Sequence, residues 1–333
     1  MAQLAMAQLA VFVRCMVRVD NGPMRIAVFG TGGVGGYFGG RLAQAGEDVV
    51  FVARGAHLEA IRRDGLAVQS PEGDFVVRPA VATDDVRTAA PVHAVLLGVK
   101  AWQVREAARA LRPLLEGAGF VVPLQNGVEA ADELVAELGA EPVVGGLCKI
   151  SSYVAGPGRI RHAGVAPRIE FGERDGRRSE RADRLRTAFE KAAGVDVAIP
   201  GDINAAIWEK FLFIAPLSGV GAVTRMPVGV LRSAPESRSM LESAMREVFD
   251  VGRARGIGLR KDAVARTMSY VDGLPADGTA SMQRDILEGR PSELDYQTGA
   301  VVRLGRESGV PVPVNDFIYR SLVPGERRAR GAA

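Results

Sequence analysis

The sequence predicts an α/β domain with a mostly parallel sheet, followed by an all-helical C-terminal domain. The chain has 333 residues, a length that favours two domains over one. From Met24 onward, short apolar runs alternate with helix-length segments, which is typical of a parallel sheet covered on both faces. Beyond Pro200-Gly201 nearly every segment has a helical pattern. We therefore expect the α/β domain at residues 24–200 and the helical domain at residues 201–325.

In the first domain, apolar runs predict buried strands at Ile26–Phe29, Asp48–Ala53, Ala94–Val99 and Phe120–Leu124. The segments between and after them predict helices at Val34–Ala45, His57–Arg63, Gln103–Leu115 and Ala130–Leu138. Residues 143–171 are broken by Gly and Pro, which indicates short strands that extend or leave the sheet. A helix at Ser179–Ala192 and a strand at Val195–Ile199 are expected to complete the domain.

In the second domain, the predicted helices are Asp202–Phe213, Ser237–Arg255, Lys261–Val271 and Tyr296–Ser308. The apolar stretch Phe211–Val220 could lie in a core or at a subunit interface, so a homodimer is left open.

Composition excludes several classes of function. The chain is 47% hydrophobic and 24% charged with a net charge of only +3, as expected for a soluble cytoplasmic protein. No aromatic residues accompany its arginine clusters, so we expect no nucleic-acid binding. Two distant cysteines exclude a disulfide scaffold and a cysteine zinc site, and the three histidines have no metal-ligand spacing. We therefore expect no bound metal.

Residues 1–23 are predicted to be a disordered N-terminal extension outside the fold. They contain a tandem Met-Ala-Gln-Leu-Ala repeat and an apolar run that ends near Val13. The run lacks a basic start and is too short to span a bilayer, so we expect no membrane association. A cleaved signal sequence is the alternative interpretation.

A glycine-rich loop follows the first predicted strand. Its sequence is Gly30-Thr31-Gly32-Gly33-Val34-Gly35, with the G-x-G-x-x-G spacing at Gly30, Gly32 and Gly35. These glycines permit, in order, a tight turn, close approach of the backbone to a pyrophosphate, and packing of helix on strand. Because the loop opens a helix, free N–H groups there favour a phosphate. The loop predicts a Rossmann-type dinucleotide-binding domain; a turn without function is the alternative.

Arg54 stands at the end of the second predicted strand, where an NAD enzyme usually has an acidic residue that binds the ribose hydroxyl. A guanidinium at this position suits a 2′-phosphate, so we expect NADP rather than NAD. The alternative is an ordinary surface arginine.

Three further polar residues stand out. Lys100 closes an apolar strand, and Asn126 follows the next one, so both should face the crevice at the carboxyl ends of the sheet. Lys210 lies in a helix that is apolar on nearly every face, where desolvation would lower its pKa and suit it to donate a proton. The alternatives are a turn role for Asn126 and a lysine that extends to solvent.

Several motifs, in order, resemble those of the ketopantoate reductase (2-dehydropantoate 2-reductase) family from about Met24 to about Phe317. They are residues 29–36 (FGTGGVGG), 99–104 (VKAWQV), 125–128 (QNGV), 206–210 (AIWEK), 281–285 (SMQRD) and 292–296 (SELDY). The resemblance implies an NADP-dependent oxidoreductase that acts on a CH–OH group. It would reduce 2-dehydropantoate to pantoate with NADPH, in pantothenate and coenzyme A biosynthesis, in a cleft between the two domains.

The resemblance also implies roles for individual residues. Arg54 would bind the 2′-phosphate, and Lys100 and Asn126 would contact the nicotinamide end of the cofactor and the substrate. Lys210 would be the catalytic proton donor, and Glu293 would orient it. Ser281, with Glu293, would bind the substrate.

The chain departs from the family at two substrate-facing positions. Ile214 and Ser218 stand where asparagines are expected, one and two helical turns after Lys210. Loss of polar groups from a site can change substrate preference strongly. The reaction type should survive, with a small 2-oxo acid as partner. The alternatives are a related NADP-dependent reductase of another 2-oxo acid, acting in either direction, and a non-catalytic NADP-sensing protein.

Overall fold

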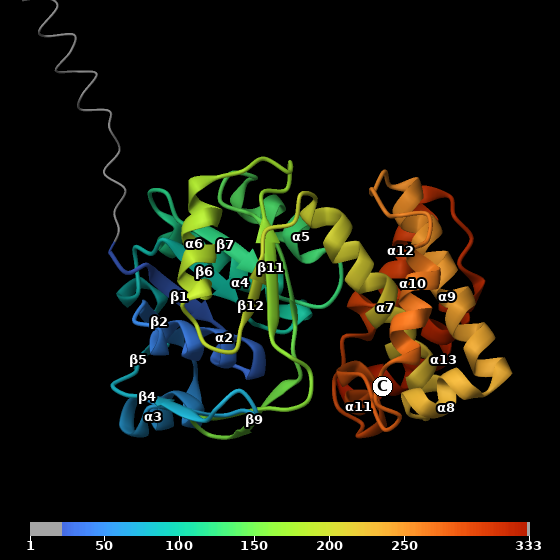
Figure 1. Cartoon of the computed structure of the whole chain (residues 1–333), viewed down its shortest axis with the longest axis horizontal. Coiled ribbons are helices and arrows are strands. Elements are labelled where there is room, and N and C mark those ends of the chain that lie inside the picture. Colours follow the sequence, from blue (N-terminus) through green and yellow to red (C-terminus); the bar gives the residue numbers. More distant parts are fainter. Residues whose placement is uncertain (1–21, 332–333) are drawn as a thin grey trace, which may run out of the picture.

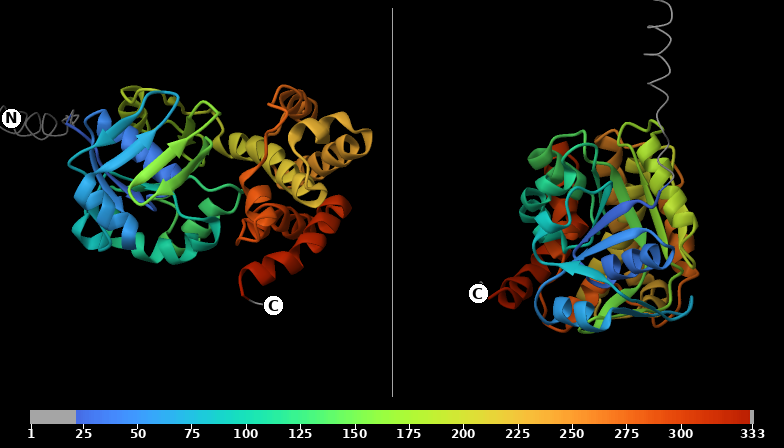
Figure 2. Two further views of the ribbon diagram at one scale, coloured as in Figure 1. Left: turned by 90° about the horizontal axis from the view of Figure 1, so that it is seen from below. Right: turned by 90° about the vertical axis from the view of Figure 1, so that its left-hand side faces the viewer.

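A computed structural model describes residues 22–331 and confirms the predicted order of an α/β domain and a helical domain (Figures 1 and 2). Helix α7 leads from the first domain into the second. Of the predicted N-terminal extension, only Gly22 and Pro23 are among the described residues. The rest of it, including Cys15, lies outside them.

The α/β domain is built on a five-stranded parallel sheet with the strand order β5-β2-β1-β6-β7. Its strands are β1 (Arg25–Phe29), β2 (Asp48–Val52), β5 (Val81–Thr83), β6 (Ala94–Leu97) and β7 (Phe120–Pro123). The order reverses at β1, which pairs with β2 on one side and with β6 on the other. In open parallel sheets ligands bind at such a switch point, outside the carboxyl ends of the strands.

Helices cover both faces of this sheet because its side chains alternate between two cores. Ile26 and Val28 of β1 join the core beneath α2, whereas Ala27 and Phe29 join the core beneath α4 and α5. The helices of this domain are α2 (Gly33–Gln44), α3 (Gly55–Asp64), α4 (Val104–Leu111), α5 (Ala130–Leu138) and α6 (Glu180–Glu190). Short 3₁₀ turns flank α4, so the predicted Gln103–Leu115 helix is three consecutive pieces.

Two smaller sheets complete the first domain. One has the order β4-β3-β10-β9 and the other β12-β11-β8. Their strands are β3 (Leu66–Gln69), β4 (Phe75–Val77), β8 (Gly145–Lys149), β9 (Ser152–Gly156), β10 (Arg159–His162), β11 (Arg168–Gly172) and β12 (Asp196–Ala198). The broken pattern of residues 143–171 is therefore confirmed as short strands, while β3, β4 and β5 were not expected from the sequence.

The helical domain surrounds α7 (Ile203–Thr224), which begins next to the predicted boundary, with Asp202 accepting a hydrogen bond from Ala205 N (3.0 Å). The other helices are α8 (Val228–Ser233), α9 (Pro235–Ala254), α10 (Ala263–Asp272), α11 (Ser281–Leu287), α12 (Thr298–Ser308) and α13 (Pro313–Ala329). Of these, α8, α11 and α13 were not expected.

Helix α7 continues through Pro216 to Thr224, so the predicted end at Phe213 was wrong. The helix is long and apolar enough to cross a membrane, yet 61% of its most apolar window is buried within the fold. Phe211, Leu212 and Val220 belong to the core of the helical domain. A helix that is apolar all round is typically a buried one, and the core of the helical domain accounts for these residues, while Phe213 and Ile214 are half-buried and line a cavity.

Replacing Gly35 should destabilise the first domain. A Cβ atom there would lie 2.3 Å from Gly30 O and 2.9 Å from Val28 Cγ1. We expect Gly35→Ala to lower the free energy of unfolding by about 1–3 kcal/mol, the usual cost of overpacking. Denaturant titration measures this change. A Cβ on Gly32 meets nothing within 4 Å, so Gly32→Ala is the matched control and should unfold like the parent. Equal stability of both variants would contradict the packing described.

Candidate active site

A cavity of about 1390 Å³ lies between the two domains. Residues of the α/β domain that line it include the glycine loop, Arg54 and Lys100. Lys210 and Glu293 of the helical domain line the same cavity. Residues that are far apart in the sequence are therefore brought to one site, as expected for a ligand bound across the sheet's switch point.

The glycine loop is tied to the neighbouring strand β2. Gly30, with φ 96°, and Thr31 donate backbone hydrogen bonds to Val52 O (3.3 Å each), and the Thr31 hydroxyl donates to the same oxygen (3.0 Å). Gly30, Thr31, Gly32, Gly33 and Val34 line the cavity, whereas Gly35 packs against β1.

The N-terminus of α2 can accept a phosphate group. No side chain caps this helix, its first turn holds no acidic residue, and Gly32 itself leaves open space where a Cβ would stand. Unsatisfied N–H groups at a helix start bind anions, so these residues fit the pyrophosphate of a dinucleotide.

Arg54 lies where β2 ends and α3 begins, with its side chain exposed along the cavity. A backbone hydrogen bond from Ala53 N to Thr83 O (3.1 Å) holds the ends of β2 and β5 together. This contact brings Arg87, which also lines the cavity, to the same end of the sheet. Sequence analysis missed this second guanidinium because the short strand β5 was not expected.

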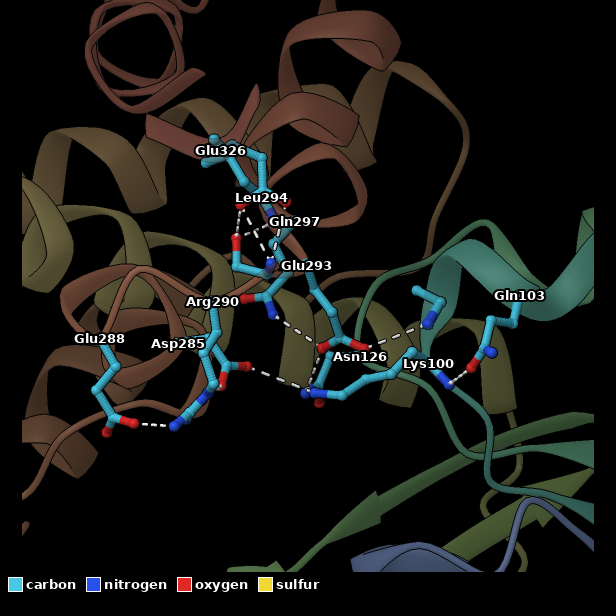
Figure 3. Close-up of polar contacts among 12 residues, drawn as sticks. Lys100, Gln103, Asn126, Asp285, Glu288, Arg290, Glu293, Leu294, Gln297 and Glu326 are labelled. Atoms are coloured by element: carbon cyan, nitrogen blue, oxygen red, sulfur yellow. Dashed lines mark hydrogen bonds and ion pairs between the residues drawn. The ribbon is translucent and has the colours of Figure 1, made fainter. Parts of the chain in front are cut away.

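Lys100 joins the two domains. Its ammonium group lies 3.5 Å from the Asp285 carboxylate of α11 (Figure 3). It also lies over the ring of Trp102. Arg290 also pairs with Asp285, at 2.7 Å, so the carboxylate is shared between two cations. Lys100 keeps a side chain that is 49% exposed, and it lines the cavity.

The carboxylate of Glu293 is buried and hydrogen-bonded from both domains (Figure 3). Oε1 accepts from Ala101 N (3.4 Å), and Oε2 accepts from Asn126 Nδ2 (3.3 Å) and Gln297 Nε2 (3.5 Å). Asn126 and Glu293 are therefore brought together. Ala101 and Gln297 were not singled out from the sequence, because neither has a residue type that indicates chemistry by itself.

Lys210, on α7, lines the cavity together with Cys148, Lys149 and Glu293. Burial lowers the pKa of Lys210, an effect that Cys148 and Glu293 oppose and that Lys149 reinforces. Among the described residues no hydrogen bond or ion pair within 4.0 Å holds its ammonium group, so the expected orientation by Glu293 is not a direct contact in this structure. The amine can thus turn toward a ligand.

Of the three remaining predicted site residues, two line the cavity and one does not. Ser281, the first residue of α11, and Ile214 both line the cavity. Ser218 is fully buried outside the cavity wall, and its hydroxyl has no partner among the described residues. A helix turns about 100° per residue, so Leu217 faces nearly the same way as Lys210 while Ser218 is rotated by about 80°. Leu217 is the residue that lines the cavity there.

Family models match both domains. The model described as "Ketopantoate reductase PanE/ApbA" matches residues 26–176, and its C-terminal counterpart matches residues 202–324. The chain belongs to the ketopantoate reductase family.

The similarity between this ketopantoate reductase family member and individual relatives extends over nearly its whole length. A 2-dehydropantoate 2-reductase of Halobacterium salinarum is 32% identical over 87% of this chain and 95% of its own. An uncharacterized oxidoreductase of Bacillus subtilis is 29% identical over 90% of this chain and 98% of its own.

Solved structures agree in fold. A PanE/ApbA family ketopantoate reductase from Ralstonia eutropha has a TM-score of 0.83 at 31% identity, over 92% of this chain and 100% of that one. A D-mandelate dehydrogenase in a ternary structure with NADH and anilino(oxo)acetate has a TM-score of 0.82 over 92% of this chain and 99% of that one. At 22% identity this second likeness concerns the fold alone.

The lowered pKa of Lys210 can be measured directly. Reductive methylation with a ¹³C-labelled reagent gives each lysine an NMR signal whose shift follows its protonation, and Lys210→Ala assigns one signal. We expect that signal to titrate below the ordinary lysine value because desolvation disfavours the ammonium form. A titration at or above the ordinary value would contradict the burial described for this amine.

Proposed function

We propose that this ketopantoate reductase family member reduces the carbonyl group of a 2-oxo acid to a hydroxyl group, with NADPH as the reductant. One observation carries the proposal: Lys210, Glu293 and Asn126 line the same cavity as a glycine loop suited to a dinucleotide. A proton donor, a fixed carboxylate and an amide at a cofactor site are the groups that carbonyl reduction needs.

The chain's own residues would hold the cofactor in three places. The start of α2 would bind the pyrophosphate, Arg54 the 2′-phosphate, and Lys100 a further anionic or polar part of the cofactor. When bound, a nicotinamide cofactor supplies the hydride. The guanidinium of Arg54 supports NADP, because the exposed end of β2 carries no acidic residue that would favour a ribose hydroxyl.

Lys210 would supply the proton. As hydride reaches the carbonyl carbon, negative charge develops on the carbonyl oxygen, and a nearby ammonium stabilises that charge. Transfer of the proton from Nζ to this oxygen leaves a neutral amine, which a desolvated site favours. Solvent that reaches the open cavity then returns the proton to Lys210.

The neighbouring polar groups would position the substrate. Glu293 is held by hydrogen bonds from Ala101 and Asn126, so its carboxylate is fixed before the ligand arrives. A fixed acceptor can orient the hydroxyl group of the product and, through charge, the Lys210 ammonium. Ser281, the first residue of α11, offers a hydroxyl group from the helical domain.

Two substrates are candidates. Membership of the family and the name of the Halobacterium relative support 2-dehydropantoate, which would be reduced to pantoate for pantothenate and coenzyme A biosynthesis. Ile214, which lines the cavity without any polar group, favours a different 2-oxo acid. In either case we propose a cytoplasmic enzyme with a small-molecule partner, and a homodimer remains a proposal.

Removing the amine of Lys210 should abolish most of the turnover. We expect Lys210→Ala to lower kcat by at least about 100-fold, the scale of general-acid catalysis, with little change in the Kd for NADPH. Oxidation of NADPH in the presence of 2-oxo acids measures kcat, and fluorescence titration measures binding. Lys261→Ala alters an exposed lysine outside the cavity and is the matched control. Normal turnover of Lys210→Ala would refute the assignment. NADPH binding without turnover by the parent protein would instead indicate a sensor.

Arg54 should decide the cofactor. We expect Arg54→Ala to weaken NADPH binding by roughly 10–100-fold and to leave NADH binding almost unchanged, because only NADPH carries the charged 2′-phosphate. Isothermal titration with each cofactor measures both constants. Arg63→Ala, on α3 and outside the cavity lining, controls for a general change in surface charge. An equal loss for both cofactors would argue against phosphate recognition by Arg54.

A further inference from the structure

One face of α7 carries an apolar stripe directly beyond the catalytic lysine. Phe213, Ile214 and Leu217 follow Lys210 by three, four and seven residues, and all of them line the cavity. Residues at these spacings share one face of a helix, about 5–6 Å apart from turn to turn. A substrate whose carbonyl group reaches Lys210 can therefore place its side chain against this stripe.

Further large apolar side chains line the cavity. Tyr270 of α10 packs edge-on against Phe213, with ring centroids 5.1 Å apart at an interplanar angle of 79°. From the α/β domain, Val154 and Val165 reach the same cavity. Tyr270 is 49% exposed, and the two valines are 45% and 44% exposed. Large apolar side chains left in water inside a cavity gain from a ligand that covers them.

Two hydroxyl groups on this side of the cavity are already engaged. The Thr267 hydroxyl donates to Ala263 O (2.8 Å), and the Thr279 hydroxyl accepts from Arg284 (3.0 Å). Lys210, Asn126 and Ser281 line the same cavity and can bind the carbonyl and carboxylate end of the substrate. Beside Lys210 the cavity thus offers polar groups to the 2-oxo acid group and an apolar stripe to its side chain.

Resting on the proposed function, we propose that the preferred substrate is a 2-oxo acid whose side chain is wholly apolar, branched or aromatic, and that Ile214 selects it. A hydroxyl group placed against Ile214 would lose its bonds to water without gaining a partner. Apolar pockets reject an added hydroxyl only moderately, by up to about 100-fold. The preference should therefore be clear but not absolute.

Two substrates isolate the effect of the hydroxyl. 2-Dehydropantoate and trimethylpyruvate share one carbon skeleton and differ only in the terminal hydroxyl group. We expect kcat/KM of the parent protein to be about 10–100-fold higher for trimethylpyruvate. Phenylglyoxylate, with an aromatic side chain, should also be turned over. An equal or higher kcat/KM for 2-dehydropantoate would overturn the proposal.

Ile214→Asn tests the selecting residue. This variant adds an amide at the wall and should reduce or reverse the preference, while Val230→Asn makes a similar change at an exposed site outside the cavity and should keep it. Thermal unfolding and NADPH titration establish that each variant is folded. A preference unchanged in Ile214→Asn would overturn the role of Ile214. Absence of turnover with every 2-oxo acid would instead refute the proposed function itself, so the two failures are distinguishable.

Discussion

The buried carboxylate of Glu293 accepts hydrogen bonds from both domains, and the geometry of the site depends on this contact. A carboxylate that is only 7% exposed is costly unless its charge is compensated by donors. Ala101 N and Asn126 Nδ2 supply donors from the ends of β6 and β7, and Gln297 supplies one from its own domain. These donors come from both domains. Their hydrogen bonds to the carboxylate therefore also fix the position of the helical domain, with α7 and Lys210, relative to the sheet.

The parallel sheet explains why the cofactor end of the cavity lies where it does. Because the strand order reverses at β1, the loops that follow the strands on its two sides run apart. The glycine loop, which follows β1, lies in the space between them. Lys100 and Asn126 stand at the ends of the next two strands. The same edge of the sheet therefore presents the phosphate-binding loop and the polar groups near the reacting atoms.

The long strands and the glycine loop could be predicted because periodicity and glycine spacing are local signals. The carboxyl ends of β6 and β7 are adjacent by topology, so Lys100 and Asn126 were expected near one crevice. The short strands β3, β4 and β5 carry too few residues for a period to show. Cys148 and Lys149 could not be placed in the same cavity as Lys210 from the sequence, because that cavity forms between the two domains.

Ser218 shows a different limit. The family resemblance placed it toward the substrate, but a rotation of about 80° from Lys210 puts it behind the cavity wall, and Leu217 lines the cavity instead. The 2′-phosphate role of Arg54 and the substrate role of Ser281 stay predictions. The most direct measurement is a crystal structure with NADP and a 2-hydroxy acid bound. We predict that the C2 hydroxyl group lies within hydrogen-bond distance of Lys210 Nζ and beside Glu293. A ligand bound away from Lys210, with Nζ directed elsewhere, would contradict the account.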